Sequence, residues 1–130
     1  MEKITQEQIE LMRRACLLCD KSELEVKTAC LILLDNKLVA EHWNTKKESV
    51  GHAEFEALKS AIEKVSPLNG ATIYVTRFPC TDCAKILIHY GIKQIFYMSD
   101  HFVSNNASLP LLSAANIEVV QISEKVVWSK

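Results

Sequence analysis

The sequence predicts an α/β fold in which helices cover both faces of a mixed sheet of about five strands, giving three α/β/α layers. One observation is a hairpin signal, in which two apolar runs near the N-terminus are separated by a short polar turn. The other is the later alternation of helical periodicity with short apolar runs. The length of 130 residues suits a single domain over residues 1–130, and a composition that is 48% hydrophobic allows a substantial core.

The first half of the chain should form one helix and the hairpin. Thr5 and Gln8 stand at capping-box spacing and mark a helix start. The apolar run that follows is bounded by polar residues typical of turns. The expected elements are a helix from Thr5 to about Cys19, a strand over Ala29–Leu34, a turn over residues 35–37, a strand over Leu38–Trp43 and a loop over Asn44–Gly51.

The second half should alternate helices and strands. Pro67 and the Asn69-Gly70 pair end a helical pattern, while Pro79 suits the first turn of another helix. Gly91 is well placed as the C-terminal cap of that helix. The expected elements are a helix over His52–Val65, a strand over Ala71–Thr76, a helix over Pro79–His89, a strand over Gln94–Met98, a helix over Leu109–Ala115 and a strand over Ile117–Ile122. The apolar tail Val126–Trp128 either packs back on the domain or meets a partner chain.

Two short segments together indicate a catalytic zinc site. They are His52-Ala53-Glu54 and Pro79-Cys80-Thr81-Asp82-Cys83. One His and two thiolates leave the fourth position of a tetrahedral zinc open, as in catalytic sites. Glu54 follows His52 closely enough to serve the water that zinc activates without itself binding the metal. The alternative is a structural zinc site whose fourth ligand lies elsewhere, although the chain offers no second spaced pair close by.

The predicted helix starts explain how these residues would work. His52 lies at or near one helix start, and Cys80 and Cys83 lie three residues apart at another, so both sulfurs can reach one ion. Partial positive charge at a helix N-terminus favours thiolate over thiol. Glu54 can take a proton from water and later give it to a leaving amine, acting first as a base and then as an acid.

With these motifs the chain resembles the cytidine and deoxycytidylate deaminase superfamily. The segments Tyr74–Lys85, Gly91–Ile95 and Ser99-Asp100 look most like deoxycytidylate deaminases. The resemblance implies a cytidine-deaminase-like fold, zinc-dependent hydrolytic deamination and a homo-oligomer, either a dimer or larger. The residues that it assigns are His52, Cys80 and Cys83 as zinc ligands, Glu54 as the proton shuttle, Asn44 as a contact to the sugar or base, and Ala53, whose backbone would meet the pyrimidine carbonyl.

By this resemblance the leading substrate is a cytosine nucleotide, deoxycytidylate (dCMP) first, or a nucleoside. Two departures keep the substrate open, because Glu56 stands where these enzymes usually carry Asn and the Asn44–Gly51 loop is shorter than theirs. The tRNA adenosine deaminases share the His-Ala-Glu and Trp-Asn elements, so adenosine and guanine-type bases stay as alternatives. A catalytically silent zinc-binding subunit is a further alternative, which an intact Glu54 disfavours.

Three more side chains have two interpretations each. Phe78 either stacks on a substrate base or packs in the core. Cys16 and Cys19 form a second Cys-x-x-Cys inside a helix. They either bind a second zinc or, as we expect, supply small core residues.

Charge and composition limit the partners. The chain has 15 basic and 16 acidic side chains and a net charge of −1, which argues against a nucleic-acid substrate and for a small nucleotide or nucleoside. No apolar run approaches the roughly 18–20 residues that span a membrane, so no membrane partner is expected. Five Cys is an odd number, and a reducing cytoplasm is the simplest location for these thiols.

Overall fold

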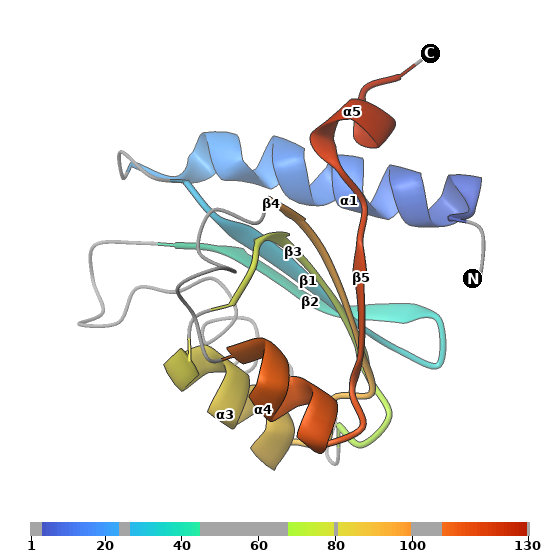
Figure 1. Ribbon diagram of the computed structural model, residues 1–130. Helices are drawn as coiled ribbons and strands as arrows, with labels where there is room; N and C mark the ends of the chain where they lie inside the picture. Colours follow the sequence, from blue (N-terminus) through green and yellow to red (C-terminus); the bar gives the residue numbers. More distant parts are fainter. Residues whose placement is uncertain (1–3, 24–26, 45–67, 80, 100–107, 130) are drawn as a thin grey trace.

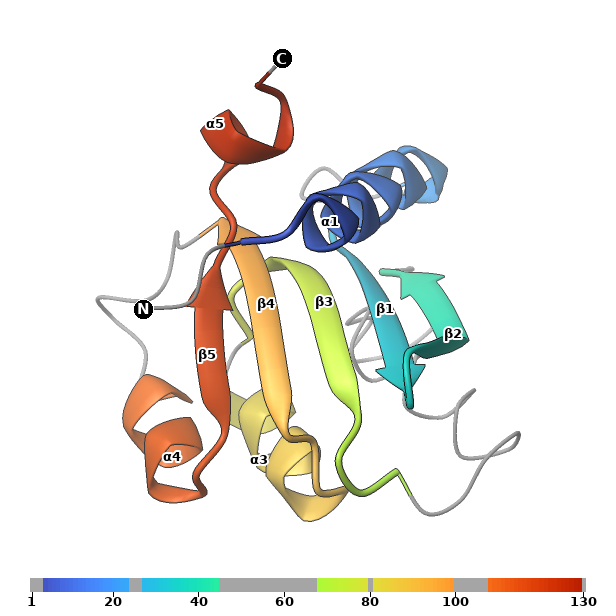
Figure 2. The ribbon, with the colours of Figure 1, turned by 90° about the vertical axis from the view of Figure 1, so that its right-hand side faces the viewer.

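In the computed structural model, a mixed five-stranded sheet carries helices on both faces (Figures 1 and 2). The structure describes residues 4–23, 27–44, 68–79, 81–99 and 108–129. The strands are β1 (Ala29–Leu34), β2 (Lys37–Trp43), β3 (Thr72–Arg77), β4 (Gln94–Ser99) and β5 (Glu118–Gln121). They lie in the order β2-β1-β3-β4-β5, which confirms the expected α/β architecture.

Helix α1 (Gln6–Leu18) begins with the predicted capping box. The Thr5 hydroxyl accepts a hydrogen bond from the backbone N–H of Gln8 at 3.1 Å, and the Gln8 side chain accepts one from the backbone N–H of Thr5 at 2.9 Å. The α-helix ends at Leu18, one residue earlier than expected. A 3₁₀ turn, η1 (Cys19–Lys21), then tightens the chain before the first strand.

The hairpin between β1 and β2 closes through a two-residue turn. Asp35 and Asn36 have φ angles of 53° and 65°, the left-handed conformation that a tight hairpin turn needs at both central positions. Leu34 therefore pairs directly with Lys37. The sequence had predicted a turn over residues 35–37, and the correction is that Lys37 already belongs to the second strand.

The second half of the sheet is parallel. β3 pairs antiparallel with β1 but parallel with β4, and β4 pairs parallel with β5. Helices α3 (Thr81–His89) and α4 (Ser108–Ala114) follow β3 and β4 respectively along the chain. The predicted helix over His52–Val65 lies outside the described residues.

Gly91 ends α3 as predicted. Its φ is +76°, its N–H donates to the Ile88 carbonyl at 3.1 Å, and the Ile92 N–H donates to the Leu87 carbonyl at 3.2 Å. These two bonds satisfy carbonyls that the end of the helix would otherwise leave unpaired, the arrangement of a Schellman motif. The cap also fixes the path of the chain into β4.

Two cores lie on opposite faces of the sheet. Leu31 and Tyr74 pack with α1 on one face, whereas Ile32 and Ile73 pack in the core that α3 and α4 cover. The two faces follow the alternation of side chains along each strand. Figure 2 shows α1 on one side of the sheet and α3 with α4 on the other.

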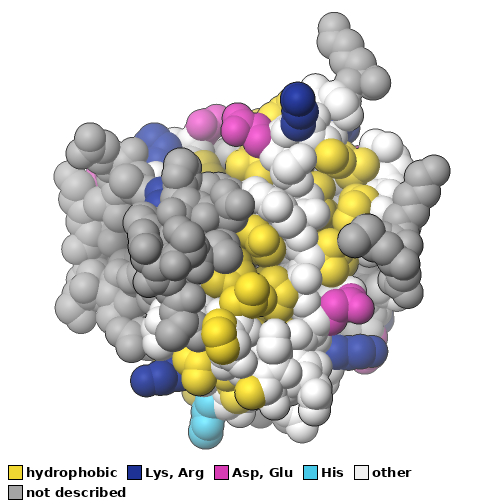
Figure 3. All heavy atoms as spheres, in the orientation of Figure 1, with side chains coloured by type: hydrophobic (Ala, Val, Ile, Leu, Met, Phe, Trp, Pro, Cys, Tyr) yellow, Lys and Arg dark blue, Asp and Glu magenta, His cyan; other side chains and the backbone are white. Residues whose placement is uncertain are grey.

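The C-terminal tail packs back on the domain. Helix α5 (Glu124–Val127) contacts α1, and Val127 is fully buried. Arg13 on α1 donates to the Val127 carbonyl at 2.6 Å. Figure 3 shows hydrophobic side chains along β5, the edge strand between α1 and α4. Among the described residues, no helix is long and apolar enough to cross a membrane.

Candidate active site

The described parts of the motif region lie together where several strands of the sheet start or end. We call this border, formed by strand ends and not by an outer strand, the site edge of the sheet. The start of β1 and the end of β2 meet there, because Ala29 pairs with Trp43. The ends of the parallel strands β3 and β4 lie at the same edge, because Arg77 pairs with Ser99. In α/β sheets of this kind, ligands bind beyond the carboxyl ends of the parallel strands. Asn44, Phe78 and Cys83 all follow strands that end at this edge.

The sequence-predicted site residues are only partly described. Cys83, Asn44 and Phe78 can be placed, whereas His52, Ala53, Glu54 and Cys80 lie outside the described residues, as does Glu56. Within the described parts of the chain, no three His, Cys, Asp or Glu residues come together as a metal-binding group.

Cys83 lies in the first turn of α3 and is 1% exposed. The first turn of a helix carries partial positive charge from the aligned peptide dipoles, which favours a thiolate at this position. The chain leading into the helix is also held in place, because the buried Ser108 hydroxyl donates to the Pro79 carbonyl at 2.9 Å. A buried, soft donor at a helix N-terminus, three residues after another Cys, fits a zinc ligand set.

Asn44 lies directly after β2 and is 8% exposed. Its side-chain oxygen accepts a hydrogen bond from the Thr28 backbone N–H at 3.0 Å and another from the Ser22 hydroxyl at 2.7 Å. Its backbone N–H donates to the Thr28 carbonyl at 2.9 Å. Asn44 is therefore held by both backbone and side chain at the site edge of the sheet.

Phe78 follows β3 and is 4% exposed. Its ring meets Tyr97 edge-on, with 4.9 Å between ring centroids and 76° between planes, and it packs in the core under α3. Of the two interpretations of Phe78, these contacts agree with packing in the core. Stacking of its ring on a substrate base stays a prediction.

Cys16 and Cys19 are half-buried against β3 and β4. The Cys16 thiol donates to the Met98 sulfur at 3.4 Å, and the Cys19 thiol donates to the Thr76 hydroxyl at 3.6 Å. Burial, with smaller contributions from Cys19 and Glu124, raises the pKa of Cys16 to about 11. Burial also raises the pKa of Cys19. Half-buried thiols that donate to acceptors on the sheet fit the expectation of small core residues, and a second zinc site stays a prediction for metal analysis.

The sequence did not predict that Ser22, Thr28 and His42 lie at or near the candidate site. Ser22 and Thr28 precede Asn44 by 22 and 16 residues, and no local pattern links them to it. Strand alternation does place His42 on the same face as Ala40, toward the core under α3. The His42 Nδ1 atom is buried and has no hydrogen-bond partner among the described residues.

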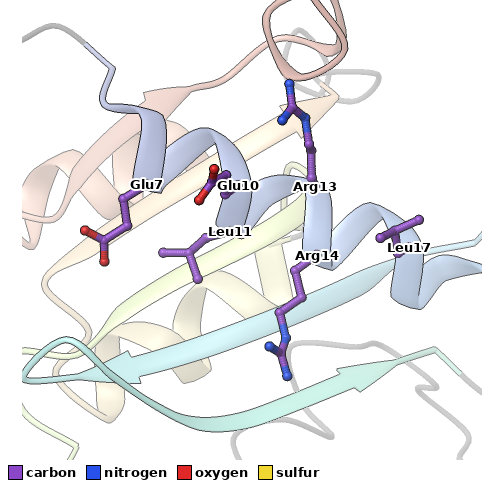
Figure 4. A pocket seen from close by; sticks show the side chains of 6 residues that line it. All are labelled: Glu7, Glu10, Leu11, Arg13, Arg14 and Leu17. Carbon is purple, nitrogen blue, oxygen red and sulfur yellow. The ribbon is translucent and has the colours of Figure 1, made fainter.

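A hollow of about 400 Å³ on the outer side of α1 is separate from this edge (Figure 4). Its lining is formed by side chains of that one helix, namely Glu7, Glu10, Leu11, Arg13, Arg14 and Leu17. Arg14 pairs with Glu41 at 2.7 Å, and that contact raises the pKa of Arg14. The hollow contains none of the predicted site residues.

The sequence matches one family model and several curated proteins. The model, described as the zinc-binding region of cytidine and deoxycytidylate deaminases, matches residues 5–99. The deoxycytidylate deaminase of Enterobacteria phage T4 is 37% identical over 83 residues, 64% of this chain and 42% of the phage protein. The tRNA-specific adenosine deaminase of Rickettsia typhi is 32% identical over 93 residues, 68% of this chain and 63% of that protein. The match thus spans less than two thirds of the length of either relative.

The fold also matches solved structures. The dCMP deaminase from the cyanophage S-TIM5 in apo form has a TM-score of 0.79 and 21% identity, covering 92% of this chain and 100% of that chain. This likeness shows a common fold, including the mixed sheet and its helical layers.

Proposed function

The chain belongs to the cytidine and deoxycytidylate deaminase family, and from this premise we propose that it is a zinc-dependent hydrolase releasing ammonia from a cytosine nucleotide. The observation that carries the proposal is the family match over residues 5–99, because that range contains both His52-Ala53-Glu54 and Cys80–Cys83. The deoxycytidylate deaminases among the relatives support dCMP as the leading substrate.

The proposed metal ligands are His52, Cys80 and Cys83. The buried position of Cys83 in the first turn of α3 supports this assignment, since the helix N-terminus favours its thiolate. Zinc with three protein ligands and an open position supplies an activated water at neutral pH. The hydrogen bond from Ser108 to the Pro79 carbonyl would hold the backbone just before Cys80.

Glu54 would move the protons. In the proposed reaction, water oxygen bonds to the amine-bearing carbon of the pyrimidine, and the bond from that carbon to nitrogen breaks. Glu54 accepts a proton from the water and passes it to the departing nitrogen, which leaves as ammonia. Cytosine and one water thus give uracil and one ammonia, and Glu54 ends in its starting protonation state.

Around the reacting centre, Asn44 would contact the sugar or base, Ala53 would meet the pyrimidine carbonyl through its backbone, and Phe78 would border the base. The superfamily resemblance extends the proposal to a homo-oligomer, and the odd number of Cys extends it to a location in the reducing cytoplasm. A second candidate is adenosine deamination on tRNA, which the 32% identity to the Rickettsia typhi enzyme favours.

The proposal is tested with Glu54→Gln, with Glu56→Gln as a matched control two residues away. Wild type and both variants should hold about one zinc per chain by elemental analysis. Ammonia release from dCMP should fall by about 10²–10⁴-fold or more in Glu54→Gln, because one group serves several proton transfers. The Glu56→Gln control should keep substantial activity.

Near wild-type turnover by a zinc-loaded Glu54→Gln variant would overturn the proton role. A wild-type protein that holds zinc but deaminates no cytosine nucleotide, nucleoside or base would overturn the proposed reaction. A panel containing dCMP, deoxycytidine, adenosine and guanine separates the candidate substrates.

A further inference from the structure

The hollow on the outer side of α1 has one acidic end and one basic end (Figure 4). Glu7 and Glu10 lie toward the N-terminal end of the helix. Arg13 and Arg14 lie in the following turn, and Leu11 lies between the two charged pairs. Figure 4 shows the two guanidinium groups pointing to opposite sides of the helix, one toward α5 and the other toward β2. The hollow therefore combines an apolar floor with separated charges of both signs.

The acidic end is not neutralised within the described parts of the chain. Glu10 and Arg14 are four residues apart, in the order that favours an ion pair along a helix. Arg14 instead donates from its Nε to the Glu41 carboxylate on β2 at 2.7 Å. Glu7 and Glu10 are both exposed, and neither forms an ion pair with another described residue. Two carboxylates are thus left for a partner outside this part of the chain.

The basic end is already ordered. Arg13 donates to the carbonyls of Val127 at 2.6 Å and Ser129 at 3.3 Å, and Arg14 is held by Glu41. A guanidinium has five N–H donors, and the Arg14 side chain is 54% exposed, so it can pair with a second carboxylate. Because both side chains are held in place, a further ion pair would cost little additional side-chain entropy.

The spacing of residues along α1 makes this face complementary to itself. The outward residues are Glu7, Glu10, Arg14 and Leu17, at intervals of three, four and three residues. These intervals read the same from either end. In an antiparallel pair of helices, Glu10 of each copy would therefore lie opposite Arg14 of the other, and Glu7 opposite Leu17. Leu17 is 63% exposed, more than any other large hydrophobic side chain among the described residues.

We propose that this face of α1 binds a second copy of the chain, with the two helices antiparallel. A parallel pair would place like charges opposite one another, which is unfavourable. One helix face is smaller than the roughly 800 Å² that each partner buries in a standard interface, so the association should be weak and concentration-dependent. The inference names a surface for the proposed homo-oligomer and does not depend on the deamination reaction.

Charge reversal in the full chain tests this surface. Glu10→Arg or Arg14→Glu alone places like charges opposite one another across the two-fold axis. Either should raise the dimer Kd about tenfold or more in sedimentation velocity over a concentration series. The double variant Glu10→Arg/Arg14→Glu exchanges the two charges and should return the Kd to within about threefold of wild type. Glu41→Gln is the matched control, because it removes a carboxylate near Arg14 but keeps the charge order of α1.

A mixture of the two single variants gives the sharpest result. One copy then carries two basic side chains at these positions and the other carries two acidic ones. The mixture should form mixed dimers at least as tightly as wild type, although each variant alone associates weakly. Raising salt from about 50 to 500 mM should weaken the association of wild type and of the mixture.

Three results would overturn the inference. They are a wild type with no concentration-dependent association up to about 500 µM, a Glu10→Arg variant that associates as tightly as wild type, and a mixture no tighter than either variant alone. Melting temperatures report whether each variant is folded. If Arg14→Glu does not fold, Leu17→Ser replaces it and should also weaken the association.

Failure of the proposed function looks different. Wild type would then release no ammonia from any cytosine nucleotide, nucleoside or base, while the association through α1 would be unchanged. A homo-oligomer that forms through another surface would be present equally in every variant, and that result would overturn α1 as the binding surface.

Discussion

Burial determines the chemistry of Cys16 and Cys19 at the scale of single residues. Both thiols are half-buried, and each donates to an acceptor on the sheet, Met98 or Thr76. Burial raises the pKa of Cys16 from 9.0 to about 11 and raises that of Cys19 as well. At neutral pH both remain protonated and behave as small apolar side chains.

A pH dependence of stability follows for Cys16. Between pH 9 and 11 the folded protein keeps this proton while the unfolded chain loses it, so the unfolded state binds fewer protons. The stabilisation is therefore complete below about pH 9 and is lost as the pH rises through about 11. Urea unfolding at pH 8 to 11 should show a steeper fall in the free energy of unfolding for wild type than for Cys16→Ala. Equal slopes would contradict the assignment.

Single residues also show where prediction from sequence stops. The His52-Ala53-Glu54 segment and the spacing of Cys80 and Cys83 together predict a site, and the structure places Cys83 in the expected helix turn. The packing of Phe78 against Tyr97 depends on two strands that meet only in the folded sheet. The bonds from Ser22 and Thr28 to Asn44 are equally nonlocal, so no sequence pattern signals them.

The end of α3 yields a prediction at the scale of an element. Gly91 has φ +76°, and a Cβ there would collide with the Asn69 side chain, lying 3.1 Å from its Cγ and closer still to its Oδ1. Gly70 is a matched control, because it has φ +85° but a Cβ there would meet nothing within 4 Å. Gly70→Ala should cost about 1–2 kcal/mol of unfolding free energy from backbone strain alone. Gly91→Ala should cost about 1–3 kcal/mol more, because of the overlap.

The double variant Asn69→Ala/Gly91→Ala separates strain from overlap. Removing the Asn69 amide should recover most of the difference between the two glycine variants in denaturant unfolding. Equal losses for Gly91→Ala and Gly70→Ala would show that the contact with Asn69 relaxes without cost.

Elements were predicted more reliably than their ends. The capping box of α1 and the glycine cap of α3 are local signals, and the structure contains both. The hairpin turn was one residue too long in the prediction, because left-handed conformations at both Asp35 and Asn36 complete it. The choice between a tail that packs back on the domain and one that meets a partner chain could not be made from sequence, because it depends on α1 as the surface that buries Val127.

At the scale of the whole molecule, the mixed sheet explains why distant segments can serve one site. The antiparallel hairpin brings Asn44 to the same edge as the carboxyl ends of β3 and β4, beside the start of α3. The opposite face is occupied by α1 and α5, which leaves the α3 face for the predicted zinc ligands. The charge of the chain then limits which substrates can approach that edge.

Substrate size is the prediction that belongs to the whole molecule. A protein that holds a nucleic acid neutralises several phosphates with basic side chains, and this chain has 15 basic against 16 acidic side chains. We therefore expect kcat/KM for dCMP or deoxycytidine to exceed that for tRNA or single-stranded DNA. For the preferred substrate, raising salt from about 50 to 200 mM should change kcat/KM little, because few counterions are released. Competition of dCMP, deoxycytidine and tRNA for one zinc-loaded sample measures the order directly. A clear preference for tRNA, with a steep loss of activity in salt, would show that a local basic surface outweighs the net charge of −1.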